Sequence, residues 1–150
     1  MFDFKNLKVK AIVLGFLSYL GVSIIIGGVL GFITSMSIMK SGGFDPQDPE
    51  SMKAMQAAMF EDNTFIIGTM LITLVGALLA GYVAAKSSKI AEVTNALVLG
   101  FILIAFGLIF TLISSTPYPI WLSATSWVLL LGGLYGGATL GTSEPEQPAA

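Results

Sequence analysis

The residues that decide the fold are VTNALVLGFILIAFGLIFTLISSTPYPIWLSATSWVLLLGGLYGGATLGTS, which run without a charged side chain from Val93 to Ser143. One continuous helix of this length would reach roughly 77 Å at about 1.5 Å per residue, whereas the hydrocarbon core of a bilayer is about 30 Å thick. The stretch is interrupted at Pro117 and Pro119. Prolines lack a backbone N–H and push the residue before them out of the α region. We therefore predict two helices, over about 90–114 and 119–141.

Two more charge-free stretches precede this one, from Ala11 to Met39 and from Asn63 to Ala85. Because about 20 apolar residues cross a membrane as a helix, each stretch predicts one span, over about 9–39 and 63–86. The first is too long for the apolar region of a cleaved signal peptide and shows no small-residue cleavage site before Thr34, so we expect it to be retained. The chain is thus predicted to be a single all-α domain over 1–150, an integral membrane four-helix bundle.

The composition supports lipid as the main solvent. Hydrophobic residues make up 55% and charged residues 11%, and the mean hydropathy is +0.86. Soluble domains carry about 25% charged residues. Cys, His and Arg are absent from the sequence, so it offers no thiol nucleophile, imidazole base or arginine clamp for phosphate. A net charge of -2 gives no basic surface for nucleic acid, and that class of partner is excluded.

The lysines predict the orientation in the membrane. Lys5, Lys8, Lys10, Lys86 and Lys89 fall on one side of the predicted spans, and only two lysines fall on the other. Positive charge is enriched in cytoplasmic loops, so we expect both termini in the cytoplasm. The tail, 142–150, has nothing to bury and is predicted to be disordered.

The loop between the first two spans is expected to contain a short amphipathic helix over about 49–60, lying on the outer bilayer surface or over the mouth of the bundle. Asp48-Pro49-Glu50 is typical of a helix start, and Met52, Met55 and Met59 follow at helical spacing. Thioethers can bind Cu(I), and the acids Asp45, Asp48 and Glu50 could hold Ca²⁺. Without His, Cys or a calcium-loop pattern, however, the sequence favours no metal and no cofactor.

Small residues recur every four positions on three predicted helices. This spacing places them on one helix face, where backbones can approach closely in lipid. The sets are Ser23, Gly27, Gly31 and Ser35; Thr73, Ala77, Gly81 and Ala85; and Gly133, Gly137 and Gly141. The last two sets lie in the same half of the membrane on helices of the same direction, so we expect them to pack together. The first set needs another partner, either the third helix through Gly100 and Gly107 or a second protomer. A functional alternative is a narrow pore lined by glycines.

Polar residues gather in the predicted cytoplasmic hairpin between the second and third spans. Lys86, Lys89, Glu92 and Asn95 are the candidates for contact with a partner or with anionic lipid. The alternative is that they only anchor the hairpin, with Asn95 bonded to a neighbouring helix.

The same hairpin carries a family resemblance. Ala80-Gly81-Tyr82-Val83-Ala84-Ala85-Lys86, followed by Asn95-Ala96-Leu97-Val98-Leu99-Gly100, resembles the hairpin of uncharacterised small four-helix bacterial membrane proteins with a Gly-Gly-Tyr-x-Ala-x-Arg/Lys motif and then His-Gly-Ala-x-x-Gly. Some twenty residues are covered. Ala80 replaces the first glycine and Thr94-Asn95 replace His-Gly. The resemblance implies a four-helix fold in a prokaryotic cytoplasmic membrane, and it brings no activity to transfer.

No ionisable residue lies in the middle of any predicted span. Such residues mark proton relays and ion pathways, so proton-coupled transport is disfavoured. The acid and base groups sit at the span ends and form no nucleophile–base set, which argues against an enzyme. We expect a non-catalytic membrane protein, an oligomeric or accessory subunit that associates through glycine-rich faces. The alternative is a small channel or transporter for an ion or neutral solute, formed on oligomerisation.

Overall fold

The structure is a computed structural model that describes residues 4–42, 45, 47–88, 90–113 and 119–142. Over these residues it is all α, as predicted, and it contains no strand. Four helices are long and apolar enough to cross a membrane: Val9–Gly42, Asn63–Ser88, Glu92–Ile113 and Ile120–Gly141. The predicted turn at 114–118, Lys89 and the predicted disordered tail from 143 onward lie outside the described residues.

The first of these helices has two α-helical parts, α1 (Val9–Val22) and α2 (Gly28–Gly42), joined by a π-helical turn over Ser23–Gly27. A π-turn takes about one more residue than an α-turn. The regular four-residue spacing of Ser23, Gly27 and Gly31 therefore does not define one straight face across it. The predicted single stripe rested on an uninterrupted α-helix, and the π-turn breaks that register.

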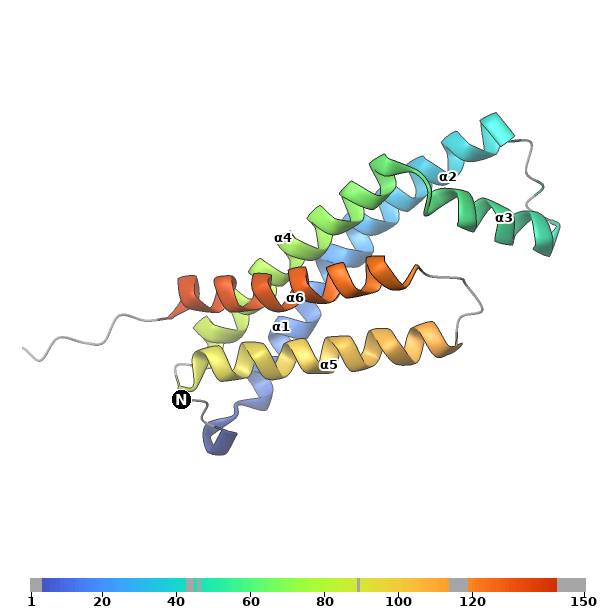
Figure 1. Cartoon of the computed structure of the whole chain (residues 1–150). Coiled ribbons are helices and arrows are strands. Elements are labelled where there is room, and N and C mark those ends of the chain that lie inside the picture. The colour runs from blue at the N-terminus through green and yellow to red at the C-terminus, as the bar shows by residue number, and fades with distance from the viewer. Residues whose placement is uncertain (1–3, 43–44, 46, 89, 114–118, 143–150) are drawn as a thin grey trace, which may run out of the picture.

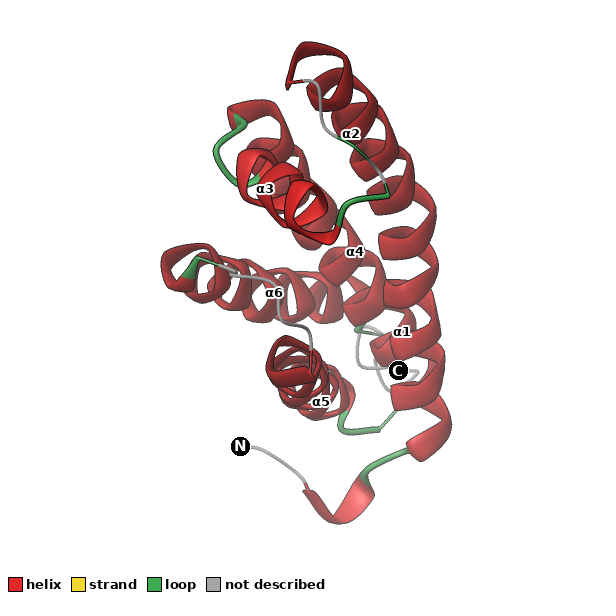
Figure 2. Ribbon diagram, turned by 90° about the vertical axis from the view of Figure 1, so that its right-hand side faces the viewer, coloured by secondary structure: helices red, strands yellow, loops and turns green. Residues whose placement is uncertain are grey.

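A short helix, α3 (Pro49–Met59), follows α2 and packs against it. Its first turn is capped by Asp48, whose carboxylate accepts hydrogen bonds from the backbone N–H groups of Glu50 (3.3 Å) and Ser51 (3.0 Å). Met55 is buried, and the Ser35 hydroxyl lies 3.5 Å from the Met59 sulfur. The α3 helix therefore lies beside the end of α2, away from the start of α1 (Figures 1 and 2).

The helix α4 (Asn63–Ser88) is central, because it packs against α1 on one side and α6 (Ile120–Gly141) on the other. The remaining helix, α5 (Glu92–Ile113), lies along α6 and also contacts α1 and α4. Figure 1 shows the start of α1, the end of α4, the start of α5 and the end of α6 gathered at one end of the molecule. We call this the hairpin end.

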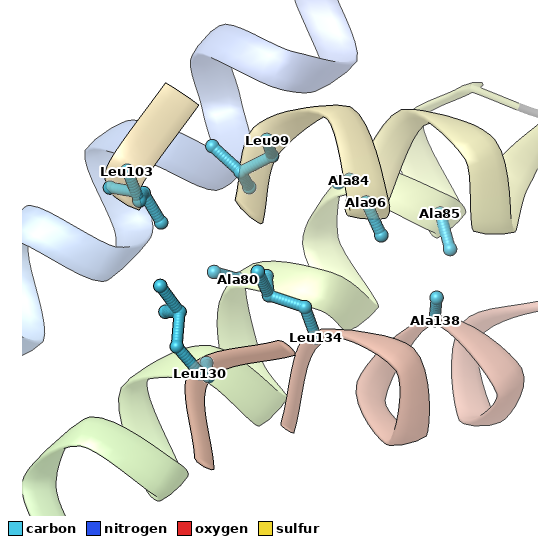
Figure 3. Packing of buried hydrophobic residues seen from close by; sticks show 10 residues of the cluster. Ala80, Ala84, Ala85, Ala96, Leu99, Leu103, Leu130, Leu134 and Ala138 are labelled. Carbon is cyan, nitrogen blue, oxygen red and sulfur yellow. The ribbon is translucent and has the colours of Figure 1, made fainter. Parts of the chain in front are cut away.

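The packed core lies near the hairpin end and is built mainly from alanine and leucine (Figure 3). Four of the alanines come from α4, one comes from α5 and one from α6, and the leucines come from α5 and α6; the set is Ala77, Ala80, Ala84, Ala85, Ala96, Leu99, Leu103, Leu130, Leu134 and Ala138. Small side chains on α4 let three helices approach it closely. Towards the other end the side chains of α5 from Ala105 to Ile113 are exposed, so the tight packing is confined to about half of the bundle.

Candidate functional site

The closest helix contact joins α4 and α6. A methyl group on Gly133 would lie 2.7 Å from Ala77 Cβ, and one on Gly141 would lie 2.8 Å from the Tyr82 carbonyl oxygen. Between them, a methyl group on Gly137 would collide with the Leu78 carbonyl oxygen. The residue numbers rise together along both helices, so α4 and α6 are parallel. Glycine is therefore required at these positions because the neighbouring backbone occupies the space of a side chain.

The α4 side of this interface uses Gly81 in the same way, since a methyl group there would collide with the Leu134 carbonyl. Ala77 and Ala85 are fully buried, and Thr73 is buried with its hydroxyl donating to the Thr69 carbonyl at 2.9 Å. The structure thus brings Ala77, Gly81 and Ala85 of the second span together with Gly133, Gly137 and Gly141 of the fourth, whereas Thr73 meets Tyr19 of α1.

The contact between α1 and α4 depends on a glycine that the spacing argument did not single out. A methyl group on Gly15 would lie 3.0 Å from the Ala80 carbonyl oxygen and 3.1 Å from Ala84 Cβ. Ala11, four residues earlier, is fully buried. The pair Ala11 and Gly15 has the same four-residue spacing as the other sets, and that pattern could have identified this face.

Three other glycines that were predicted to pack are open. Gly27 and Gly31 in the first span and Gly107 in α5 have no described neighbour within 4 Å of the place a methyl group would occupy. Gly100 faces α6 instead, since a methyl group there would lie 2.7 Å from the Leu131 side chain and 2.9 Å from the Leu134 side chain. The expected pairing of the first span with Gly100 and Gly107 is therefore not formed, because Gly100 faces α6.

Next to the π-turn, three hydroxyl groups meet between α1 and α4. The Tyr19 side chain interacts with those of Ser23 and Thr73. The Tyr19 ring also lies against Gly76, where a methyl group would be 3.3 Å from it. Ser35, further along, donates to the Gly31 carbonyl at 2.7 Å. Tyr19 thus gives the first span a polar contact with α4, and Ser35, 3.5 Å from the Met59 sulfur, gives it one with α3.

At the hairpin end, Asn95 connects three segments and is fully buried. Its amide nitrogen donates to the carbonyls of Ile90 (3.1 Å) and Ala91 (2.9 Å), and its carbonyl accepts from the backbone N–H of Lys8 at 2.8 Å. Ala91 adopts a positive φ of 52°, which L-residues rarely do. Asn95 was predicted either as a partner contact or as an anchor of the hairpin bonded to a neighbouring helix. Its buried bonds to the hairpin and to the start of α1 agree with the anchor.

The charged residues of this end differ in their surroundings. Lys86 is exposed near the end of α4, Glu92 is half-buried in the first turn of α5, and Lys89 lies outside the described residues. Lys8 and Lys10 at the start of α1 are also exposed and were not among the predicted contact residues. The hydrogen bond from Lys8 to Asn95 brings them to the hairpin. Within the described chain, no group of three or more His, Cys, Asp or Glu side chains could hold a metal ion.

Comparison with known proteins gives no relative: no family model, curated protein or solved structure matches the chain. The geometry itself defines the class, a helical bundle with four helices suited by length and composition to a membrane.

Proposed function

We propose that this chain is a non-catalytic integral membrane protein, an oligomeric or accessory subunit that associates through the face of its first span that bears Gly27 and Gly31. The observation that carries the proposal is the imbalance between the spans. Only 6% of the most apolar part of Val9–Gly42 is buried within the chain, against 22–28% in the other three helices. The first span therefore has the largest share of surface left for another molecule.

The open glycines favour a protein neighbour over lipid on that face. In a helix interior, Gly costs about 1 kcal/mol relative to Ala, so it is disfavoured without a packing role. The glycines of α4 and α6 that meet backbone have such a role inside the chain, while Gly27 and Gly31 do not. In lipid, small residues let helix backbones approach and associate. A second copy of the chain or an accessory protein would supply the missing contact.

Mass measurement in mild detergent tests this proposal. The native protein should purify as a defined oligomer or with a bound membrane partner, and Gly31→Leu should release it as a monomer. Gly132→Leu is the matched control, because Gly132 is equally open but lies on α6. A monodisperse wild-type monomer without a partner would refute the proposal, and so would equal behaviour of the two variants.

A second candidate, a small channel or transporter for a neutral solute, is favoured by the hydroxyl groups of Tyr19, Ser23 and Thr73, which give a polar site within the apolar stretch. It predicts solute flux into proteoliposomes that Thr73→Val reduces. Vesicles that admit neither ions nor small neutral solutes would exclude it.

The proposed orientation, with both termini in the cytoplasm of a prokaryotic cell, is testable separately. The chain has no Cys, so single cysteines at Ser51 and Ser87 can be labelled in intact cells with an impermeant maleimide. Both side chains lie outside the packed core. Only the cysteine at position 51 should react, and labelling at position 87 alone would reverse the orientation.

A further inference from the structure

Charged side chains are segregated to the two ends of the bundle. Lys5, Lys8, Lys10 and Lys86 lie at the hairpin end, where Glu92 is the one acidic side chain among the described residues. The opposite end carries five acids and two lysines: Asp45, Asp48, Glu50, Glu61, Asp62, Lys40 and Lys53. The described part of the hairpin end is therefore net positive and the described part of the other end is net negative.

Packing places three of the lysines at the same level along the bundle. Gly15 of α1 packs against Ala80 and Ala84 of α4. The two helices run in opposite directions, so the helical turn of α1 before Gly15 lies at the level of the last turn of α4. That level holds Lys10 on α1 and Lys86 on α4. The 2.8 Å hydrogen bond from the Lys8 backbone to Asn95 then ties the entry of α1 to the start of α5. The backbone positions of Lys8, Lys10 and Lys86 are thus set by buried contacts, while their side chains are exposed.

Apolar surface adjoins these lysines. Val9, between Lys8 and Lys10, is 73% exposed, and Ile90 in the hairpin is 47% exposed. A ligand that fits both features has an anionic head and an apolar body. A free phosphate ion would use only the lysines and leave Val9 and Ile90 in water.

We propose that the hairpin end binds the headgroup of an anionic phospholipid, with Lys8, Lys10 and Lys86 around the phosphate and the acyl chains along Val9 and Ile90. Lysine ammonium groups attract the anionic surface of a cytoplasmic leaflet, each with a contribution worth about fivefold in affinity. Three lysines give a preference on the order of 100-fold over a zwitterionic lipid. Asn95 is the positioning residue. The inference rests on the proposed membrane location and is independent of the proposed oligomer.

The test is native mass spectrometry of the full-length protein in mild detergent, titrated with phosphatidylglycerol or with phosphatidylcholine of the same acyl chains. We expect phosphatidylglycerol to bind on the order of 100-fold more tightly. The variant K8Q/K10Q/K86Q should reduce this preference to within a few-fold. The matched control K40Q/K53Q, with lysines at the opposite end, should retain it. Equal binding of the two lipids would overturn the proposal, as would an equal loss in the control.

Additional ligands and variants in the same titration separate the roles of the lipid body, the lysines and Asn95. Soluble glycerol phosphate should not bind as tightly as phosphatidylglycerol, and equal binding would show that the lipid body has no part. If the triple variant is not recovered folded, K86Q alone should weaken the preference about fivefold. Asn95→Leu should weaken it while K8R/K10R/K86R preserves it, and no effect of Asn95→Leu would remove its positioning role. The same spectra report the oligomeric state, so failure of the lipid proposal is distinguishable from failure of the proposed function.

Discussion

Gly137 offers the sharpest test of how the bundle is held together. Replacing it with alanine adds one methyl group, which would collide with the Leu78 carbonyl oxygen and lie 2.9 Å from the Tyr82 backbone nitrogen. Both groups belong to the α4 backbone and cannot rotate aside as a side chain would. The two helices must therefore separate, and the neighbouring contacts at Gly133 and Gly141 would loosen with them.

The magnitude follows from two opposing effects. Overpacking a close contact costs about 1–3 kcal/mol, and the upper part of this range applies because backbone has to move. The gain in helix propensity on replacing Gly by Ala returns about 1 kcal/mol. We expect Gly137→Ala to lower the free energy of unfolding by about 2 kcal/mol. Gly132→Ala, on the same helix but with open space around it, should raise that free energy by up to about 1 kcal/mol.

The assay is reversible unfolding from mild detergent into denaturing detergent, followed by helical circular dichroism and by the fluorescence of Trp121 and Trp127 on α6. The free energies of unfolding of the two variants should differ by about 3 kcal/mol. If Gly137→Ala and Gly132→Ala unfold at the same detergent fraction, the close parallel packing of α4 and α6 would be refuted.

Three other perturbations act on single contacts. Asn95→Leu preserves volume but removes the acceptor for the Lys8 N–H and the two hydrogen bonds donated to the hairpin. It should lower the free energy of unfolding by about 2–3 kcal/mol in the same assay. Wild-type stability of this variant would contradict the role of Asn95. Ala91→Gly should stabilise the protein by about 1 kcal/mol because Ala91 holds a φ of 52°, and a destabilised variant would argue against that conformation. Asp48→Ala removes both capping hydrogen bonds of α3 and should cost about 1 kcal/mol locally. Hydrogen exchange in Glu50–Met55 should therefore accelerate while exchange in α4 stays unchanged, and uniform acceleration would contradict a local cap.

The sequence predicts the four long helices because charges and prolines mark their ends, and these features act locally. The predicted span 63–86 compares with Asn63–Ser88 in the structure, and 119–141 with Ile120–Gly141. The packing of these two helices also follows from their direction and from the depth of their small residues. Both arguments use one-dimensional spacing, which a regular helix converts directly into a face.

The sequence does not predict features that depend on the backbone conformation or on backbone groups from a distant part of the chain. The Asn95 side-chain carbonyl accepts a hydrogen bond from the backbone N–H of Lys8. Every residue except proline has such an N–H, so the sequence does not indicate which distant one Asn95 will bind. The π-turn at Ser23–Gly27 interrupts a stretch whose spacing fits a regular α-helix. Gly15 shows the opposite case, since its four-residue spacing from Ala11 in the sequence marks the face that packs on α4.

The helices differ in length, and this difference explains why the two ends of the bundle are built differently. At about 1.5 Å per residue the 22 residues of α5 or α6 reach about 33 Å, close to one hydrocarbon thickness, whereas the 34 residues of Val9–Gly42 reach about 51 Å. All of these helices share the hairpin end, so the excess length must lie at the other end. In the proposed membrane location, α2 would extend past the lipid there and expose Ser37 and Ser41 to water. At this end α3 packs beside α2. The charge pattern agrees, because the acids of Asp45 to Asp62 follow this extension in the chain. By contrast, α5 from Val93 and α6 from Ile120 carry no charge to their ends. The bundle therefore combines a tightly packed, lysine-bearing half with a longer half that would reach water in the proposed membrane location, and the first span runs through both.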